Sequence, residues 1–135
     1  MTIKQGQVMM LMTSVNEVLN NAGRQYGSEF HKGLHFSVEY KLIKLMKELS
    51  KIDSEFAVTT REMFSSKGLT FGEKGEVVFP ESFTDSDKAD FGVWEKEVLL
   101  KEFEVDFVKL SVEEMKDVIL SDCNNKGMFI EFCIE

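Results

Sequence analysis

Three side chains that could bind a metal ion follow one another at intervals of four residues. His31, His35 and Glu39 would face one side of a continuous helix, and imidazole and carboxylate groups are common metal ligands. Gly33 lies between the two histidines and weakens such a helix, and the sequence offers no fourth ligand. We therefore expect surface or partly buried histidines here, and no metal or other cofactor.

Acidic side chains gather in a second segment, whose composition suits a calcium-binding loop: Asp85, Asp87, Asp90 and Glu97. Such a loop needs oxygen ligands at positions one, three and five, glycine at position six and glutamate at position twelve. Counted from Asp85, positions five, six and twelve hold Ala89, Asp90 and Lys96. Because three requirements fail, we expect the acids to stabilise the start of a helix through its dipole instead.

Residues that could act as nucleophiles are far from the histidines in the sequence. Cys123 and Cys133 lie near the end of the chain, whereas His31 and His35 precede its middle. No nucleophile elbow and no phosphate-binding glycine loop occurs, and no pair of carboxylates can be selected among so many acids. We expect a protein that is not an enzyme, with two buried, inert thiols rather than a disulfide.

The net charge of −8 is distributed unevenly along the chain. Residues 1–67 contain nine Lys and Arg against seven Asp and Glu, whereas residues 68–135 contain seven against seventeen. An acidic half disfavours direct binding to nucleic acids and anionic membranes, and suits a partner protein with a basic surface. A solvated acidic face that only keeps the protein soluble is the alternative. The partner-binding residues expected on this face are Asp85, Asp87, Asp90, Glu95 and Glu102.

A weak basic stripe lies in the less acidic half of the chain. Lys44, Lys47 and Lys51 would share one face of a helix, but Glu48 and Glu55 interrupt that face, and no aromatic residue lies among the lysines. We expect a solvated face there, or a face that docks on the acidic half of a neighbouring copy. Direct binding of DNA is not expected.

The length of 135 residues suits a single domain, with a helical part at 1–67 and an acidic part at 68–135. Hydrophobic residues make up 43% of the chain and twelve residues are Phe, which indicates a globular core filled by rings. The opening MTIKQGQVMMLM has too short an apolar run for a secretory signal or a membrane span. A cytoplasmic protein with reduced thiols is expected.

A heptad seam marks a long second helix, expected from about Phe36 to Phe64: Val38, Leu42, Leu45, Leu49, Ile52 and Phe56. A first helix, expected over Gln7–Asn21, repeats the spacing with Val8, Met12, Val15, Leu19 and Ala22. The two stripes predict a long helical hairpin with coiled-coil-like packing. Because the first helix is only roughly half as long as the second, the rest of the seam must pack on the C-terminal half or on a second copy. We expect a homo-oligomer through these helices.

The C-terminal half predicts a small β-sheet with two short helices. LTFGEKGEVVF, residues 69–79, alternates around a glycine-rich turn like a hairpin. Thr84 or Asp85 suits the N-cap of an acidic helix, and Ser111 with Glu114 forms a capping box for a helix over VEEMKDVIL. EVDFVKL, residues 104–110, and MFIEFCIE, residues 128–135, are expected as strands of a β-α-β element. The predicted fold class is therefore α+β.

The segments KLIKLMKEL and WEKEVLLKEFEVDFVKLSVEEM occur in the order typical of a family of short, uncharacterised tailed-phage proteins. The chain resembles this family in pattern over roughly Val38 to Met115, without matching the hairpin or MFIEFCIE. The resemblance implies a phage origin and no assigned activity. We expect a non-catalytic interaction module that binds and inhibits a host protein of defence or nucleic-acid handling through its acidic half. A self-associating virion assembly or scaffold component is the alternative.

Overall fold

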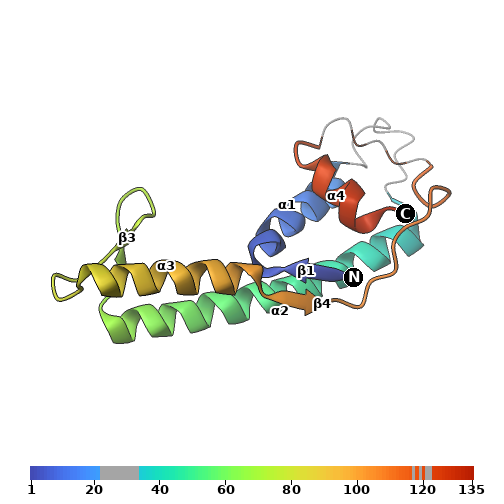
Figure 1. The fold of residues 1–135 in the computed structure, drawn as a ribbon. Coiled ribbons are helices and arrows are strands. Elements are labelled where there is room, and N and C mark those ends of the chain that lie inside the picture. The colour runs from blue at the N-terminus through green and yellow to red at the C-terminus, as the bar shows by residue number, and fades with distance from the viewer. Residues whose placement is uncertain (22–33, 117, 119, 121–122) are drawn as a thin grey trace.

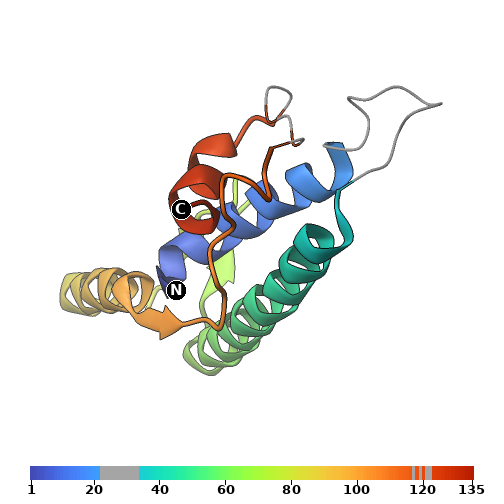
Figure 2. The ribbon, with the colours of Figure 1, turned by 90° about the vertical axis from the view of Figure 1, so that its right-hand side faces the viewer.

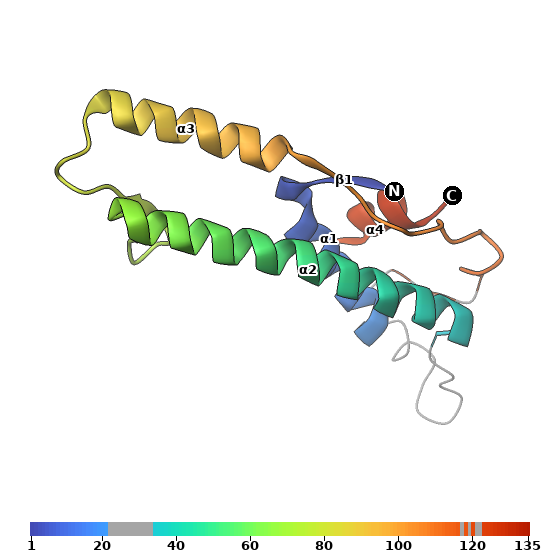
Figure 3. The same cartoon turned by 90° about the horizontal axis from the view of Figure 1, so that it is seen from below.

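A computed structural model describes residues 1–21, 34–116, 118, 120 and 123–135 of the chain. Figure 1 shows two parts, a head that contains both chain ends and an arm that projects from it. We define the arm as residues 50–100 and the head as the other described residues. Helix α2 (Phe36–Lys67) passes from the head into the arm, and helix α3 (Asp85–Leu100) returns beside it in the opposite direction (Figures 1 and 3). The chain is an α+β protein in which helices predominate.

The core of the head lies between α1 (Gln5–Asn21) and the N-terminal half of α2 (Figure 2). A stripe of α1 residues spaced by three and four is fully buried: Val8, Leu11, Val15 and Val18. The first four seam residues of α2 are at most 1% exposed: Val38, Leu42, Leu45 and Leu49. The first two helices pack on each other as predicted, but the stripe predicted for α1 was wrong in part, because Leu11 and Val18 are buried whereas Met12 and Leu19 are only half-buried. α1 begins two residues earlier than predicted, and α2 continues to Lys67.

Helix α4 (Lys126–Cys133) packs on α1 at the position where the sequence predicted a strand. The strand prediction for MFIEFCIE was wrong, because a short segment that is apolar except for Glu131 and Glu135 does not distinguish a helix from a strand by its period. Phe129 and Cys133, four residues apart, are fully buried, whereas Ile130 is 49% exposed. Glu17 of α1 holds the start of α4, since its carboxylate accepts hydrogen bonds from the backbone N–H and the side-chain amide of Asn125, each at 3.1 Å.

Strand β1 (Thr2–Lys4) pairs with β4 (Glu102–Glu104) in an antiparallel ribbon where the arm joins the head. Ile3, in the middle of β1, is fully buried in the head core. β1 was not predicted, because three residues are too few to show a period. The prediction of a strand over 104–110 was wrong in extent. β4 starts at Glu102 and ends at Glu104, because its partner β1 has only three residues. The strands of the described residues form two separate two-stranded sheets, β1 with β4 and β2 with β3, in place of the single C-terminal sheet that was predicted.

The predicted hairpin is present at the far end of the arm, where β2 (Thr70–Phe71) pairs with β3 (Val77–Val78). Gly68 ends α2 and turns the chain toward this hairpin. Its φ of 73° lies in the left-handed region, and its N–H donates to the carbonyl oxygen of Ser65 at 3.4 Å. A side chain at this position would be strained, so glycine suits the turn.

The predicted helix over VEEMKDVIL is not formed by the described residues, although its capping box is. The Ser111 N–H donates to the Glu114 carboxylate, and the Glu114 N–H donates to the Ser111 hydroxyl, both at 3.1 Å. The residues that follow form turns, because one capped turn alone does not propagate a helix. The predicted β-α-β element was therefore wrong. What remains of its parallel pairing is a bridge between Leu110 and Ile134.

Candidate protein-binding site

The seam residues of α2 become more exposed where the helix leaves the head. Leu49 is fully buried, whereas Ile52 and Phe56, the next two seam residues, are only half-buried. Figure 3 shows α3 running alongside this part of α2. None of the sixteen residues of α3, all of which the structure describes, is buried. The two helices of the arm therefore leave apolar surface open to other molecules.

Aromatic rings gather at the end of the arm: Phe64, Phe71, Phe79, Phe83, Phe91 and Trp94. Phe91 is central, with its ring centroid 5.9 Å from that of Phe64, 5.3 Å from Phe79 and 5.6 Å from Trp94. These separations lie in the range in which aromatic pairs attract one another. Phe64 is buried, whereas the other five rings are half-buried or exposed. We call these six residues the aromatic cluster.

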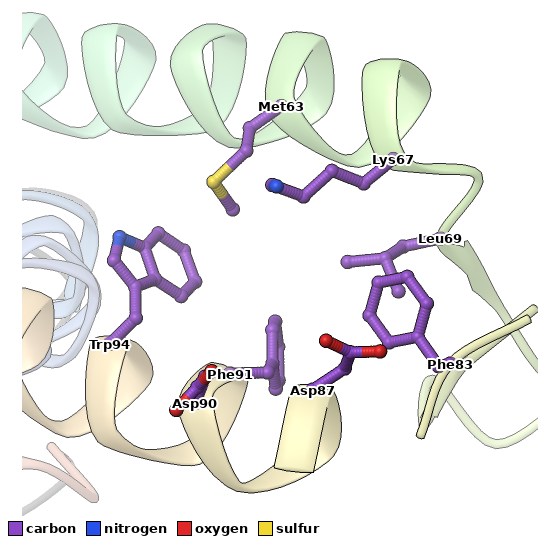
Figure 4. A pocket seen from close by; sticks show the side chains of 8 residues that line it. All are labelled: Met63, Lys67, Leu69, Phe83, Asp87, Asp90, Phe91 and Trp94. Atoms are coloured by element: carbon purple, nitrogen blue, oxygen red, sulfur yellow. The ribbon is translucent and has the colours of Figure 1, made fainter. Parts of the chain in front are cut away.

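A cavity of about 280 Å³ opens beside the aromatic cluster, between α2 and α3 (Figure 4). Its lining combines apolar walls with three charged side chains: Met63, Lys67, Leu69, Phe83, Asp87, Asp90, Phe91 and Trp94. Lys67 extends from the last turn of α2 into the cavity, and Asp87 and Asp90 lie on α3 across from it. The cavity is thus apolar on its walls and carries both signs of charge at its edge.

Asp87 is oriented by the capping box that begins α3. The Thr84 N–H donates to the Asp87 carboxylate at 2.8 Å, and the Asp87 N–H donates to the Thr84 hydroxyl at 3.1 Å. The hydrogen bond from the Thr84 backbone, then that from its hydroxyl, and to a lesser extent the charge of Lys67, lower the pKa of Asp87. Asp87 therefore presents a fixed negative charge at neutral pH.

Replacement of Thr84 by alanine is expected to raise the pKa of Asp87 partway toward its ordinary value, because the hydroxyl bond is lost while the backbone N–H remains. A lowered pKa means that the Asp87 carboxylate stabilises α3 above about pH 4 and loses this effect as the pH falls through the folded-state value. Carboxyl-detected NMR titration of Asp87 measures the change. Thr84→Ser retains a hydroxyl and serves as the control; an equal rise of the pKa in both variants would contradict the assignment.

The acids expected to form a single partner-binding face are distributed around the arm. Asp87 and Asp90 line the cavity. Asp85 and Glu95 are exposed on other sides of α3. Each is five residues from Asp90, which at about 100° per residue places it about 140° from Asp90 around the helix. Glu102 lies outside the arm, in β4, opposite Lys4 of β1. The structure therefore brings two of the five acids together.

Two lysines of α2 contact acidic residues of the same chain, and one of them, Lys44, belongs to the basic stripe. Lys41 pairs with Glu114 at 2.8 Å, and Lys44 lies 3.7 Å from the carboxylate of Asp106. The hydrogen bond from Lys41, followed by that from the Ser111 N–H, lowers the pKa of Glu114. The acidic segment after β4 is thus held on this face of α2.

The other candidates for chemistry give no site in the part of the chain that the structure describes. His31 lies outside that part, and His35 caps α2, since its Nδ1 accepts a hydrogen bond from the Ser37 backbone N–H at 3.4 Å. No group of three or more His, Cys, Asp or Glu among the described residues could hold a metal ion. Cys123 and Cys133, both described, form no disulfide and are buried, as predicted, and burial raises the pKa of Cys133 to about 12. No helix of the described residues has the length and apolar character needed to cross a membrane.

The sequence interpretation missed the cavity, although it predicted the acidic helix that carries Phe91 and Trp94. The available signal was the density of rings between Phe64 and Trp94, where five of the twelve Phe and the single Trp of the chain occur.

Comparisons with protein-family models, with curated proteins and with solved structures found no match. The function must therefore be inferred from the chemistry of the arm.

Proposed function

We propose that the protein is a non-catalytic interaction module that binds a partner protein with a basic surface through its arm. The observation that carries this proposal is the aromatic cluster, which lies half-exposed at the far end of the arm, beyond the head core. Large exposed apolar patches on folded proteins often mark interaction sites. Aromatic side chains in a cavity are also typical of the residues that contribute most to binding at protein interfaces.

The charge of the arm favours a basic partner. Residues 50–100 contain eleven Asp and Glu against six Lys and Arg. Charges of opposite sign on two surfaces accelerate and orient their association, whereas like charges oppose it. An aromatic anchor surrounded by acids therefore suits a basic protein surface and disfavours nucleic acid, whose phosphates are negative.

The resemblance to short tailed-phage proteins supplies a biological setting for this proposal. The partner would be a bacterial host protein of defence or nucleic-acid handling, since proteins that bind nucleic acid present basic surfaces. The acidic arm would cover such a surface and block access of the nucleic acid, which would inhibit the partner. Binding of this kind would take place in the host cytoplasm.

Capture of a partner from host lysate by the full-length chain tests the proposal, followed by titration of the purified partner by calorimetry. One variant reverses three exposed acids of the arm: Asp85, Asp90 and Glu95, each to Lys. The control variant reverses three exposed acids of the head: Glu113, Glu131 and Glu135, each to Lys. We expect the arm variant to lose binding and the control variant to retain it, although both change the net charge equally.

Salt provides a second readout in the same experiment. Binding of a basic partner by the acidic arm should weaken as the ionic strength rises, because salt screens exposed charges. Affinity that is independent of salt, or that falls equally in the arm and head variants, would contradict the proposal.

Self-association is the second candidate function, favoured by the half-buried seam residues Ile52 and Phe56. An assembly or scaffold component could cover these residues with a second copy of the arm. Two acidic arms repel each other, so self-association should strengthen as salt rises, opposite to binding of a basic partner. Mass in solution, measured by light scattering across the same salt series, distinguishes the two candidates.

A further inference from the structure

We infer that the cavity between α2 and α3 is a receptor for one arginine side chain of the basic partner, and that Lys67 occupies it until the partner binds. This inference rests on the proposed function, because it names the chemical group that the arm recognises. Three observations support it: the size of the cavity, the chemistry of its walls, and the cation that the chain already places there.

The size of the cavity fits a single side chain. Its volume of about 280 Å³ falls just below the range of about 300–1,000 Å³ typical of small-molecule sites. It opens beside α3, whose residues are all half-buried or exposed, so a side chain that projects from a partner surface could enter without displacing an element of the fold.

The walls of the cavity match a guanidinium group better than an ammonium or an apolar group. Phe83, Phe91 and Trp94 provide aromatic rings, and a cation is attracted to the face of such a ring. Asp87 and Asp90 place two carboxylates at one side. A planar guanidinium can stack on a ring and donate two hydrogen bonds to a carboxylate at the same time, whereas an ammonium cannot do both.

Lys67 shows that this environment already accepts a cation. Its side chain extends into the cavity from α2, in the space between the apolar walls and α3 (Figure 4). Its charge acts on Asp87 across the cavity. One lysine faces two carboxylates, so the cavity retains a net negative charge while Lys67 is in place. The long, flexible stem of Lys67 can move aside into water when an arginine enters.

A second copy of the chain is a poorer occupant than a basic partner. The arm contains eleven acids against six basic residues, so the approach of an identical arm would bring two negative surfaces together. The same excess of acids attracts a basic segment toward the cavity before contact. The occupant to which the charges point is therefore an arginine that projects from a basic partner surface.

Binding can be measured with the full-length protein and a short peptide, acetyl-Gly-Arg-Gly-amide. Trp94 lines the cavity and is the single Trp of the chain, so its fluorescence and its indole N–H resonance report on this site alone. We expect a saturable change in both signals with the arginine peptide. The same peptide with citrulline, which has nearly the same shape without the charge, should bind at least about fivefold more weakly.

Three variants test the roles of the charged groups. Lys67→Met removes the resident cation but keeps an apolar stem, and should tighten binding of the arginine peptide by about two- to fivefold. Asp90→Asn should weaken it by about the same factor. Glu97→Gln, the matched control, changes an exposed carboxylate of α3 outside the cavity and should have no effect. Circular dichroism would verify that each variant keeps its helices.

Equal binding of the arginine and citrulline peptides, or no change in the Trp94 signals with either, would overturn the inference. Weaker binding by Lys67→Met would do so as well, because it would make Lys67 a contributor rather than a competitor. The inference can also fail while the proposed function holds. If reversal of the arm acids abolishes partner capture while Lys67→Met and Asp90→Asn leave it unchanged, the arm binds the partner without an arginine in the cavity.

Discussion

Replacement of Leu42 by alanine is expected to lower the free energy of unfolding by about 2–5 kcal/mol, a large part of the total for a domain of this size. Leu42 is fully buried between α1 and α2, so the truncated side chain leaves a cavity in the head core. Urea denaturation followed by circular dichroism measures the loss. The matched variant is Phe56→Ala, at the last position of the same seam.

Phe56→Ala should cost on the order of 1 kcal/mol, because Phe56 is only half-buried on the arm and its ring already contacts water. Equal losses for the two variants would show that the distal seam is as fully packed as the proximal seam. That result would contradict the description of the arm as an open surface, and with it the basis of the proposed function.

Replacement of Phe129 by alanine is expected to have a still larger effect, with a loss of about 3–5 kcal/mol. Phe129 is among the largest side chains that are fully buried, and it anchors α4 to the head. The control is the neighbouring Ile130→Ala. Ile130 is 49% exposed, so its truncation should cost less than about 1 kcal/mol. Thermal or urea unfolding of the two variants gives the comparison.

A third substitution, Phe132→Ala, added to this pair tests whether the C-terminal segment is a helix. In α4, Phe132 and Cys133 follow Phe129 by three and four residues and face the head with it. In a strand, Phe132 would instead share a face with Ile130. Losses at Phe129 and Phe132 with little loss at Ile130 would agree with the helix, whereas similar losses at Ile130 and Phe132 would favour the strand.

Local signals predicted the elements of this fold that depend on local energetics. The heptad spacing of α2 and the Thr84 cap of α3 each act within a few residues. α2 formed within three residues of its predicted bounds, and α3 begins at the predicted cap. The hairpin of β2 and β3 likewise depends on its own turn. These parts of the fold were accessible from sequence because their partners are near in the chain.

The elements that were missed depend on partners far away in the chain. α4 is a helix whose start is bound by Glu17 and whose buried face packs on the core residues of α1. The sequence MFIEFCIE alone does not reveal these distant contacts. The Ser111–Glu114 box formed without its helix, and the pairing of Glu114 with Lys41, 73 positions earlier, lies outside any local pattern. The cavity was missed for the same reason, because it joins Lys67 and Asp87 from two helices separated by a hairpin.

The ribbon of β1 and β4 implies an order in which the chain can fold as it is synthesised. Thr2 and Glu104 are neighbours in that ribbon, although 102 residues separate them in sequence. α1 and α2 can pair early, and the aromatic cluster can form within residues 64–94, while β1 still has no partner. The whole arm is synthesised before β4, so β1 can pair with β4 only after the arm has left the ribosome. Because such distant closure is slow, we expect the arm to assemble before the head is complete.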